Sequence, residues 1–177
     1  MKKTFLIGVC IVAFWANSFA QSNLKGERGV SSIGAMVGYA IESEKAVVGI
    51  DYRYNILDRL RLTPSVLYGI KRNNADIWYL NADAHYLARV SENFTLYPIG
   101  GIGFSFWKYR MIPDIDLSDI DLVLQNVDTY LRIGINMGIG GELRLTEDII
   151  AGAEFKYNWT KQGFNQAMIL VRAAYYF

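Results

Sequence analysis

The sequence has 177 residues, with 18 basic side chains against 17 acidic ones, so its net charge is close to zero. This balance gives no electrostatic reason to expect nucleic acid as a partner, because nucleic-acid-binding domains carry a basic excess. The length fits one domain. The 12 Tyr, 9 Phe and 16 Gly residues against only 3 Pro favour β-strands over helices or disorder.

Residues 1–20 have the three regions of a cleaved signal peptide. Two lysines follow Met1, an apolar run covers residues 5–15, and Ser18-Phe19-Ala20 places small residues at positions −3 and −1 of a cleavage site before Gln21. The alternative is an uncleaved anchor, but the apolar run is shorter than the roughly 20 residues that a spanning helix needs. We therefore expect a mature domain of residues 21–177.

Cysteine and histidine are too scarce for most metal, redox or nucleophile chemistry. Cys10, the single cysteine, lies within the leader, so we expect no thiol and no disulfide in the mature chain. When Lys2 and Lys3 leave with the leader, 16 basic residues remain against 17 acidic ones, a net charge of −1. His85 is the only histidine, which argues against a zinc site. We expect neither a metal nor a cofactor.

The dominant pattern of the mature chain is a period of two, in which apolar residues alternate with small, polar or charged ones. This period predicts β-strands, because successive side chains of a strand point to opposite faces. Eight segments show it: 33–41, 48–55, 60–70, 78–90, 94–106, 130–145, 149–159 and 169–177. Their lengths are close to the 9–11 residues or so that a tilted membrane-spanning strand requires.

One face of these segments carries charged and polar residues together with many glycines. Glycines facing water would leave an external surface nearly bare, whereas in a narrow lumen they make room for long neighbours. The opposite face carries Leu, Ile, Val and Ala, with aromatic residues near the strand ends, as a lipid-facing surface does. We therefore predict a polar network in the lumen. Its residues are Asp51, Arg53, Asp83, His85, Arg89, Arg132, Glu142, Arg144, Glu154, Lys156 and Arg172.

These faces predict an all-β fold, a closed antiparallel up-and-down transmembrane barrel of about eight strands. A soluble barrel alternates in the opposite sense, with its apolar face inside. Short connections near residues 57–58, 91–93 and 146–147 alternate with others near 43–45, 73–74, 113–129 and 162–163. This rhythm places both chain ends on the periplasmic side. Pro64 and Pro98 fall on the apolar face within strands, where we expect a bulge to accommodate them.

Two short motifs resemble a known family. The stretch Leu96-Tyr97-Pro98-Ile99-Gly100-Gly101-Ile102-Gly103-Phe104 is similar to the recurring strand of small outer-membrane β-barrel, porin-family proteins, the group around OmpX, OmpW and the OmpA membrane domain. The ending Tyr175-Tyr176-Phe177 resembles the C-terminal signal that barrel assembly machinery recognises, which implies that role for Tyr175 and Phe177. The resemblance implies location in the cell outer membrane, with its lipid and lipopolysaccharide as partners. We expect no peptidoglycan-binding domain after Phe177.

The interior of a barrel of this size is just wide enough for side chains to fill it, so its charges should pair. Glu154 and Arg172 lie on adjacent strands with matching parity, and we predict that they form a pair. A second predicted cluster contains Asp51, Arg53, Arg61 and Asp83. We favour a plugged interior, and a polar permeation path is the alternative.

His85 has two interpretations. It could act as a base, as in the outer-membrane barrels that modify lipid A. However, such enzymes work at the lipid-facing outer rim, whereas the parity of His85 points inward, near Asp83 and Arg89. We therefore expect a hydrogen-bonded lumen histidine and no enzyme activity.

The segment 113–129 is the longest predicted connection, and it is acidic. It contains no Lys or Arg, and a capping-box pattern at Ser118 predicts a short amphipathic helix. A protruding hairpin is the alternative. The acidic groups could bind calcium, but without the glycine and terminal glutamate of an EF-hand we favour a solvated external loop. Its acidic residues are Asp114, Asp116, Asp119, Asp121 and Asp128.

The sequence therefore predicts a non-enzymatic outer-membrane barrel with a plugged polar lumen and a structural or surface-interaction role for its external loops. The surface partner is unknown. The alternative is a narrow channel for passive transport of small or hydrophobic solutes, as the OmpW resemblance implies. A lumen that is apolar near its outer mouth would favour this channel. The charged residues on the inward face of the strands argue against the channel.

Overall fold

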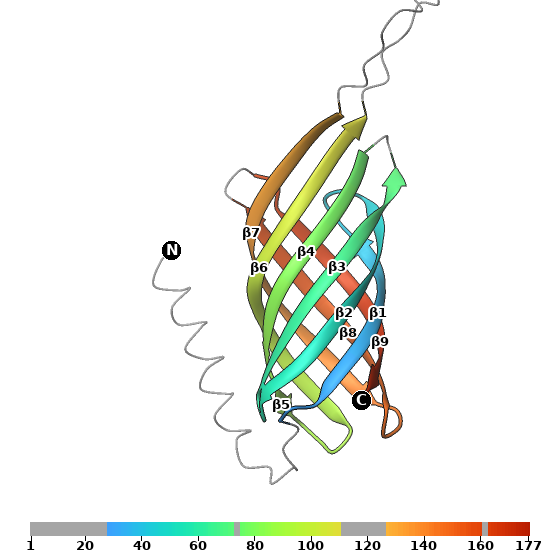
Figure 1. Ribbon diagram of the computed structural model, residues 1–177, viewed down its shortest axis with the longest axis vertical. Helices are drawn as coiled ribbons and strands as arrows, with labels where there is room; N and C mark the ends of the chain where they lie inside the picture. Colours follow the sequence, from blue (N-terminus) through green and yellow to red (C-terminus); the bar gives the residue numbers. More distant parts are fainter. Residues whose placement is uncertain (1–27, 73–74, 111–126, 161–162) are drawn as a thin grey trace, which may run out of the picture.

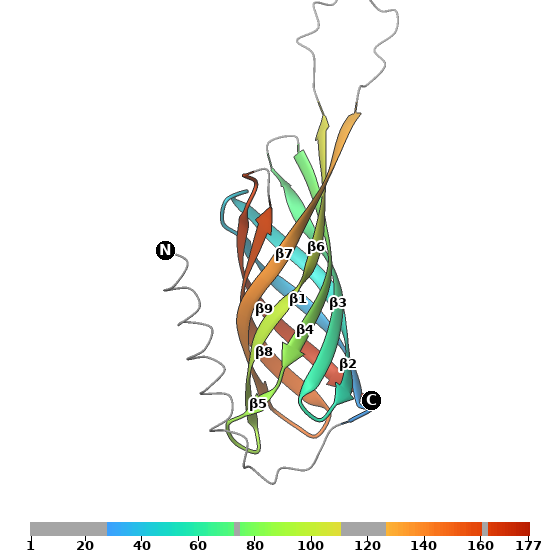
Figure 2. The same ribbon diagram turned by 90° about the vertical axis from the view of Figure 1, so that its left-hand side faces the viewer.

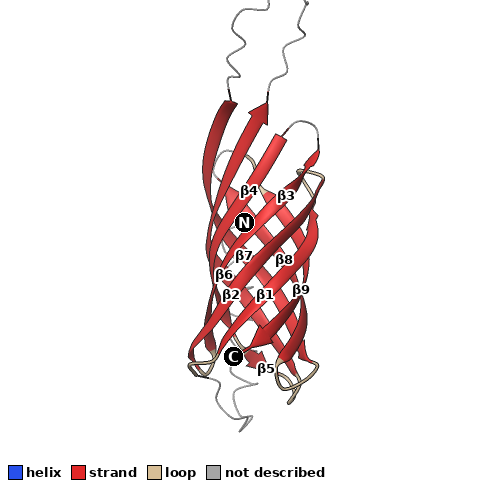
Figure 3. Cartoon of the chain, turned by 45° about the vertical axis from the view of Figure 1, so that its right-hand side comes forward, coloured by secondary structure: helices blue, strands red, loops and turns tan. Residues whose placement is uncertain are grey.

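The computed structural model describes residues 28–72, 75–110, 127–160 and 163–177. The predicted signal peptide and the acidic residues Asp114, Asp116, Asp119 and Asp121 lie outside these ranges. Nine strand segments cover most of the described chain (Figures 1 and 3). They are β1 (Ser31–Ala40), β2 (Lys45–Leu57), β3 (Leu60–Arg72), β4 (Ala75–Tyr86), β5 (Ala88–Arg89), β6 (Phe94–Arg110), β7 (Val127–Arg144), β8 (Ile149–Thr160) and β9 (Gln166–Tyr176).

The strands form one closed antiparallel barrel. Their order is β4-β3-β2-β1-β9-β8-β7-β6-β5, and β4 also pairs with β6, which closes the sheet. β5 continues β4, because both pair with β6 in one register: His85 lies opposite Ile99, and Ala88 opposite Leu96. The nine segments therefore make eight strands, as predicted. Within the described ranges, no helix is long and apolar enough to cross a membrane.

The two strand prolines do not sit at bulges, so that prediction was wrong. Pro98 keeps its place opposite Ile139, and Pro64 lies in register with Ala82. On the strand facing Pro98, the pairing with β6 is interrupted between His85 and Ala88, and Leu87 donates its N–H to the carbonyl of Arg59 at 2.8 Å. A proline offers no ladder donor, so the opposing strand loses its pairing at that level.

The predicted faces are confirmed on every long strand. On β7, Leu131, Ile133, Ile135 and Ile139 each expose half or more of their surface, and they point outward. The intervening residues point into the barrel, where Asn136 is fully buried. The outer surface is therefore a continuous apolar belt, and the polar residues lie inside it.

Aromatic side chains gather near the two ends of this belt. At the end that carries the C-terminus, here called the base, Tyr52 and Phe177 have ring centroids 6.5 Å apart. At the opposite end, here called the rim, Tyr68 and Trp78 lie 4.8 Å apart. Girdles of aromatic residues at both interfaces are typical of membrane barrels.

Strands β6 and β7 are the longest, with 17 and 18 residues, and they extend beyond the others at the rim (Figures 1 and 2). β6 pairs with β4 almost to its end, through Ala75 opposite Tyr109. β7 pairs with β8 only from Gly134 onward. Within the described residues, the pairing with β8 therefore covers Gly134 to Arg144 of β7.

Candidate functional site

The base half of the lumen is built around one arginine. Arg53 on β2 donates from Nε to Asp51 Oδ2 at 2.7 Å and from Nη1 to Glu142 Oε2 at 2.7 Å. Its Nη2 donates to Glu154 Oε1. The hydroxyl of Tyr97 also donates to Glu154, at 2.9 Å. All of these side chains are buried, so one guanidinium neutralises parts of three carboxylates.

Two further arginines complete this cluster. Arg61 binds Glu142 through both terminal nitrogens, at 2.8 and 2.9 Å, and donates from Nε to Asn55 at 2.8 Å. Arg172 Nη2 lies 2.9 Å from Asp51 Oδ2. We call the three arginines and three carboxylates the ionic network. They are Arg53, Arg61, Arg172, Asp51, Glu142 and Glu154.

The ionic network crosses the barrel from wall to wall. In the strand order, β2 and β7 are diametrically opposite, and the Arg53–Glu142 bond joins them directly. Its positive and negative charges are equal in number, as burial in a low-dielectric interior requires. The bonds of this network therefore link strands on opposite walls of the barrel.

The predicted pairing of Glu154 with Arg172 was wrong. The β8–β9 register places Glu154 opposite Leu170 and Arg172 opposite Gly152. Glu154 instead contacts Arg53 and Tyr97, whereas Arg172 contacts Asp51. Both residues nevertheless belong to the ionic network.

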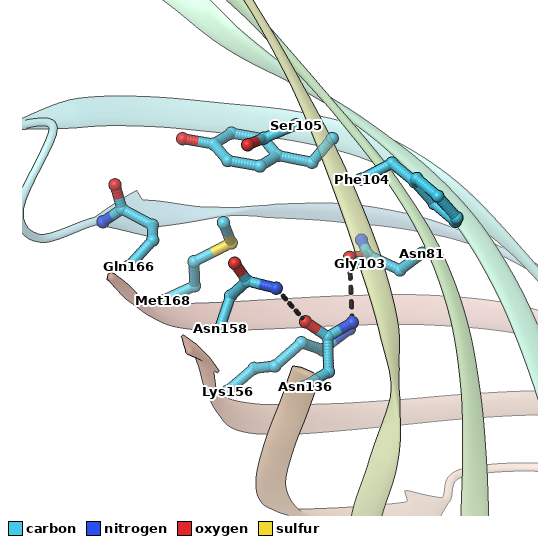
Figure 4. A pocket seen from close by; sticks show the side chains of 10 residues that line it. Asn81, Gly103, Phe104, Ser105, Asn136, Lys156, Asn158, Gln166 and Met168 are labelled. Atoms are coloured by element: carbon cyan, nitrogen blue, oxygen red, sulfur yellow. Dashed lines mark hydrogen bonds between the residues drawn. The ribbon is translucent and has the colours of Figure 1, made fainter. Parts of the chain in front are cut away.

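Asp83 belongs to a second layer, nearer the rim, rather than to the cluster of Asp51 and Arg53. Its carboxylate lies 2.5 Å from Lys156 Nζ, and its Oδ1 accepts from Asn136 Nδ2 at 2.7 Å. Asn136 also donates to Asn81 at 3.0 Å and accepts from Asn158 at 2.7 Å, as Figure 4 shows. The cavity beside these amides measures only about 10 Å³, which is the space of one water molecule.

The inward glycines make room for large neighbours, as predicted. A Cβ on Gly140 would meet the Tyr97 ring, with Cζ at 2.5 Å. A Cβ on Gly34 would meet the Asp51 carboxylate and Arg172 Nη2. These distances are shorter than real Cβ contacts, so the ionic network depends on the missing side chains.

His85 lies in the lumen, as predicted, and it is fully buried. Its ring stacks on Tyr97 with centroids 4.7 Å apart, and its Nδ1 lies 3.4 Å from the hydroxyl of Thr63. The other ring nitrogen has no hydrogen-bond partner among the described residues. His85 is thus packed inside the barrel, away from the lipid-facing surface.

The remaining predicted arginines lie at the two ends of the lumen and are half-buried. Arg89 and Arg144 border a cavity of about 20 Å³ at the base, and Arg144 Cζ is 5.4 Å from the Tyr176 ring. Arg132 lies at the rim, with Cζ 3.0 Å above Phe164 and 5.2 Å from Trp107. These three arginines therefore lie at the two ends of the lumen and not at its centre.

The rim half of the lumen contains an apolar cluster, which sequence reasoning missed. Its buried side chains pack together beneath Trp107, and none is more than 4% exposed. These residues share the inward parity of the charged ones, and this parity, read residue by residue, could have revealed them. We call this cluster the apolar layer. It contains Met36, Ala40, Val47, Leu67, Ile77, Tyr79, Met168 and Leu170.

Above the apolar layer, the barrel mouth holds a cavity of about 280 Å³. It lies between the β1–β2 turn, the rim end of β6 and the chain that leads into β9. We call it the mouth cavity. Its lining residues are Glu42, Ser43, Trp107, Tyr157, Gly163, Phe164, Asn165 and Gln166.

The proposed assembly residues lie at the base. Tyr175 and Phe177 point outward and are more than half exposed. The N–H of Phe177 donates to the carbonyl of Ser31 at 3.0 Å, so the terminal residue still continues the ladder toward β1. This placement leaves both side chains open to a partner from outside the barrel.

The described interior of the barrel is therefore packed with paired polar side chains and the apolar layer, and the mouth cavity lies open above them. In the described ranges, no group of three or more His, Cys, Asp or Glu side chains is placed to hold a metal ion. A network of buried charges whose members are all paired favours one arrangement of the interior.

Comparisons with known proteins agree with this architecture. The chain resembles the N-terminal β-barrel domain of Pseudomonas aeruginosa OprF, with 16% identity, a TM-score of 0.63, and 86% of this chain and 100% of that one covered. It resembles Ail of Yersinia pestis, with 16% identity, a TM-score of 0.59 and coverage of 85% and 99%. It also resembles Neisserial surface protein A, with 13% identity, a TM-score of 0.59 and coverage of 83% and 94%.

No curated protein sequence matches the chain significantly. The structural likenesses show a shared fold and, at these identities, nothing finer. The model of the outer membrane protein beta-barrel domain, however, matches residues 5–177. Because this match spans nearly the whole sequence, the chain belongs to the outer membrane protein beta-barrel domain family.

Proposed function

We propose that the protein is a non-enzymatic anchor in the outer membrane, closed to solutes and bearing its interaction surfaces at the rim. The base faces the periplasm, and the rim faces the cell exterior. The observation that carries the closed lumen is the ionic network, in which Arg53 bonds to Glu142 on the opposite wall. The cavities that border this network and the amide layer measure only about 20 and 10 Å³.

The surface role is supported by the hairpin of β6 and β7, which reaches farthest from the barrel (Figure 2). In this hairpin β6 and β7 pair with each other as far as Arg110 and Val127, whereas β8 pairs with β7 only from Gly134 onward. Lipopolysaccharide, host surfaces and neighbouring cells are the candidate partners.

Two relatives are consistent with a surface role without establishing it here. Ail is described as the attachment invasion locus protein of Yersinia pestis, and one of its structures holds the heparin analogue sucrose octasulfate. The Neisserial relative is described as a surface protein. A shared barrel fold does not imply a shared binding partner, so these names show only that adhesion is one of the roles to test.

Planar-bilayer recording of the purified protein tests the closed lumen. We expect no stepwise conductance, because paired charges and packed side chains leave no continuous water path. The Arg53→Ala variant serves as the positive comparison, because it removes the side chain that bridges β2 and β7. Steady conductance of the unmodified protein would show a hydrated pore and overturn the closed-lumen proposal.

A hairpin deletion tests the surface role. Tyr109 and Asp128 lie directly opposite each other, so a two-residue Asn-Gly turn can replace residues 110–127. We expect the shortened protein to reach the membrane in normal amounts and to lose adhesion of expressing cells to immobilised host-matrix proteins. Equal adhesion by the shortened and full-length proteins would show that the β6–β7 hairpin is not the interaction surface.

Passive transport of small hydrophobic solutes is the second candidate function, and the apolar layer near the mouth favours it. Leu67 and Ile77 are fully buried, so a solute would have to displace packed side chains to pass. Uptake of a hydrophobic dye into protein-containing vesicles distinguishes the two functions. Uptake that exceeds the rate of empty vesicles would support transport over the closed anchor.

We also propose that Phe177 acts in assembly. Its side chain is 69% exposed, so its removal should change the stability of the folded barrel little. Deletion of Phe177 is expected to lower the amount of folded protein in the outer membrane while secretion continues. The check is the ratio of heat-modifiable to total protein on a gel, and an unchanged ratio would make the terminal residue incidental.

A further inference from the structure

The mouth cavity is a bowl that is open to the exterior and closed below. Trp107 packs on the apolar layer, which forms the floor. Gln166 borders both the mouth cavity and the one-water cavity beneath it (Figure 4). At about 280 Å³ the bowl is just under the ~300–1,000 Å³ of typical small-molecule sites, so it fits a ligand of about one ring.

One wall of the mouth cavity is polar and held in place by hydrogen bonds. Gln166 is 2% exposed, and its Nε2 donates to Glu42 Oε2 at 2.8 Å. The N–H of Ala167 donates to the same oxygen at 2.5 Å. These bonds fix the Glu42 carboxylate, and its Oε1 receives no bond from the described residues.

A buried hydroxyl belongs to the same wall. Ser43 Oγ is buried and has no hydrogen-bond partner among the described residues. A buried polar atom without a partner costs free energy, and a ligand hydroxyl that bonds to it would remove that cost. Glu42 and Ser43 thus offer adjacent acceptors on one turn.

The other wall is aromatic, and a cation already occupies it. Trp107 and Phe164 have centroids 6.1 Å apart at an interplanar angle of 58°. The guanidinium of Arg132 lies 3.0 Å above Phe164 and 5.2 Å from Trp107. Arg132 at this wall and Glu42 at the polar wall carry opposite charges, so together they give no net preference for a cation or an anion, which suits a neutral ligand.

We propose that the mouth cavity binds a single neutral sugar ring. A pyranose has one face of C–H groups, which suits the indole of Trp107, and a rim of hydroxyls. Those hydroxyls donate to Glu42 Oε1 and bond with Ser43 Oγ. The ring comes either from a free monosaccharide or from the terminal unit of a surface glycan. This site requires neither the closed lumen nor the surface role of the β6–β7 hairpin.

The test is isothermal titration of the protein purified from outer membranes, with glucose, galactose and N-acetylglucosamine up to about 50 mM, since isolated sugars are expected to bind near 1 mM. Oligosaccharides that end in the same units form the second arm. Tighter binding of the oligosaccharide points to a glycan source, and equal binding to a free sugar. Tetramethylammonium and sucrose octasulfate are the charged competitors.

Two pairs of variants locate the binding. Trp107→Leu and Glu42→Ala are expected to weaken sugar binding about tenfold or more. Trp159→Leu removes a lipid-facing Trp outside the cavity, and Glu44→Ala removes an acid from the same turn outside the lining; both should leave binding unchanged. Heat-modifiability of each variant confirms that it is folded.

Three results would overturn the proposal. The first is the absence of saturable binding for every neutral sugar in the panel. The second is sugar binding that both cavity variants retain, which would place the site elsewhere. The third is stronger binding of tetramethylammonium or sucrose octasulfate than of any neutral sugar, which would assign the bowl to a charged ligand.

Discussion

The two halves of the lumen are filled in different ways. The base half holds the ionic network, in which each partner is fixed by direction and distance. The rim half holds the apolar layer, whose side chains are equally buried but make only non-directional contacts. The same inward parity of the same strands therefore supports two kinds of interior.

The two halves contribute differently to the stability of the barrel and to the specificity of its fold. Burying charges costs desolvation that their mutual attraction roughly offsets, so an ion network adds little net stability but penalises every wrong arrangement. Apolar burial stabilises by the area removed from water and tolerates changes of shape. We infer that the base half specifies the arrangement of the strands, whereas the rim half adds stability by burying apolar side chains.

The largest effect is expected from the Arg53→Ala substitution. It leaves the carboxylates of Asp51, Glu142 and Glu154 without their shared partner in a buried site. Removing one member of a buried ion pair costs about 3–5 kcal/mol. Urea unfolding in lipid vesicles measures the loss in the free energy of unfolding.

The Arg144→Ala variant is the matched control for Arg53. Arg144 is half-buried at the base, where it lies against the Tyr176 ring and water can reach it. We expect a loss well below that of Arg53→Ala. Similar losses for the two variants would mean that the ionic network is hydrated, and the contrast between the two halves would disappear.

A smaller loss, about 3 kcal/mol, is expected from Leu67→Ala in the apolar layer. Leu67 is fully buried, so its truncation removes buried area and leaves a cavity. The same unfolding assay gives the stability, and bilayer recording should show that the barrel remains closed, because the ionic network is intact. Conductance in this variant would assign the seal to the apolar layer alone.

The fold could be predicted from the sequence because the alternation that marks each strand is visible within that strand alone. Alternation along β7 from Leu131 to Leu145 separates the two faces without knowledge of any other strand. The charged residues assigned to the lumen do lie inside or at its ends. The interruption of the strand at Leu87 was not foreseen, because it follows from Pro98 on the neighbouring strand.

The partners of the charges could not be predicted in the same way. Contacts such as Arg53 with Glu142 cross the lumen between opposite strands, and no pairing register relates those positions. The prediction of Glu154 with Arg172 assumed neighbours on adjacent strands and was wrong for that reason. The apolar layer was missed because its members, such as Leu67 and Ile77, are dispersed over several strands.

The next prediction, of intermediate size, concerns coupling energies within the ionic network. It tests whether two residues must be directly bonded to be coupled, or whether belonging to the network is enough. Arg61 and Glu142 share two hydrogen bonds, whereas Glu154 and Arg172 are bonded to different partners, Arg53 and Asp51. In double-mutant cycles to alanine, we expect a coupling of about 1–3 kcal/mol for the first pair and clearly less for the second. Equal couplings would show that the network responds as one electrostatic unit rather than through individual bonds.

The last comparison concerns two glycines that differ in what surrounds them, and its expected effect is no larger than that coupling. Gly140→Ala places a methyl group against the Tyr97 ring, and such overpacking costs about 1–3 kcal/mol. Gly100→Ala is the control, because Gly100 faces outward with nothing within 4 Å of an added Cβ, and an alanine there should be neutral or slightly stabilising. The Tyr97→Val substitution should make Gly140→Ala nearly harmless, since it removes the clashing ring. If Gly140→Ala remained equally costly in the Tyr97→Val background, its cost would arise from the β7 backbone, and the glycines would no longer explain how the base half accommodates its large polar side chains.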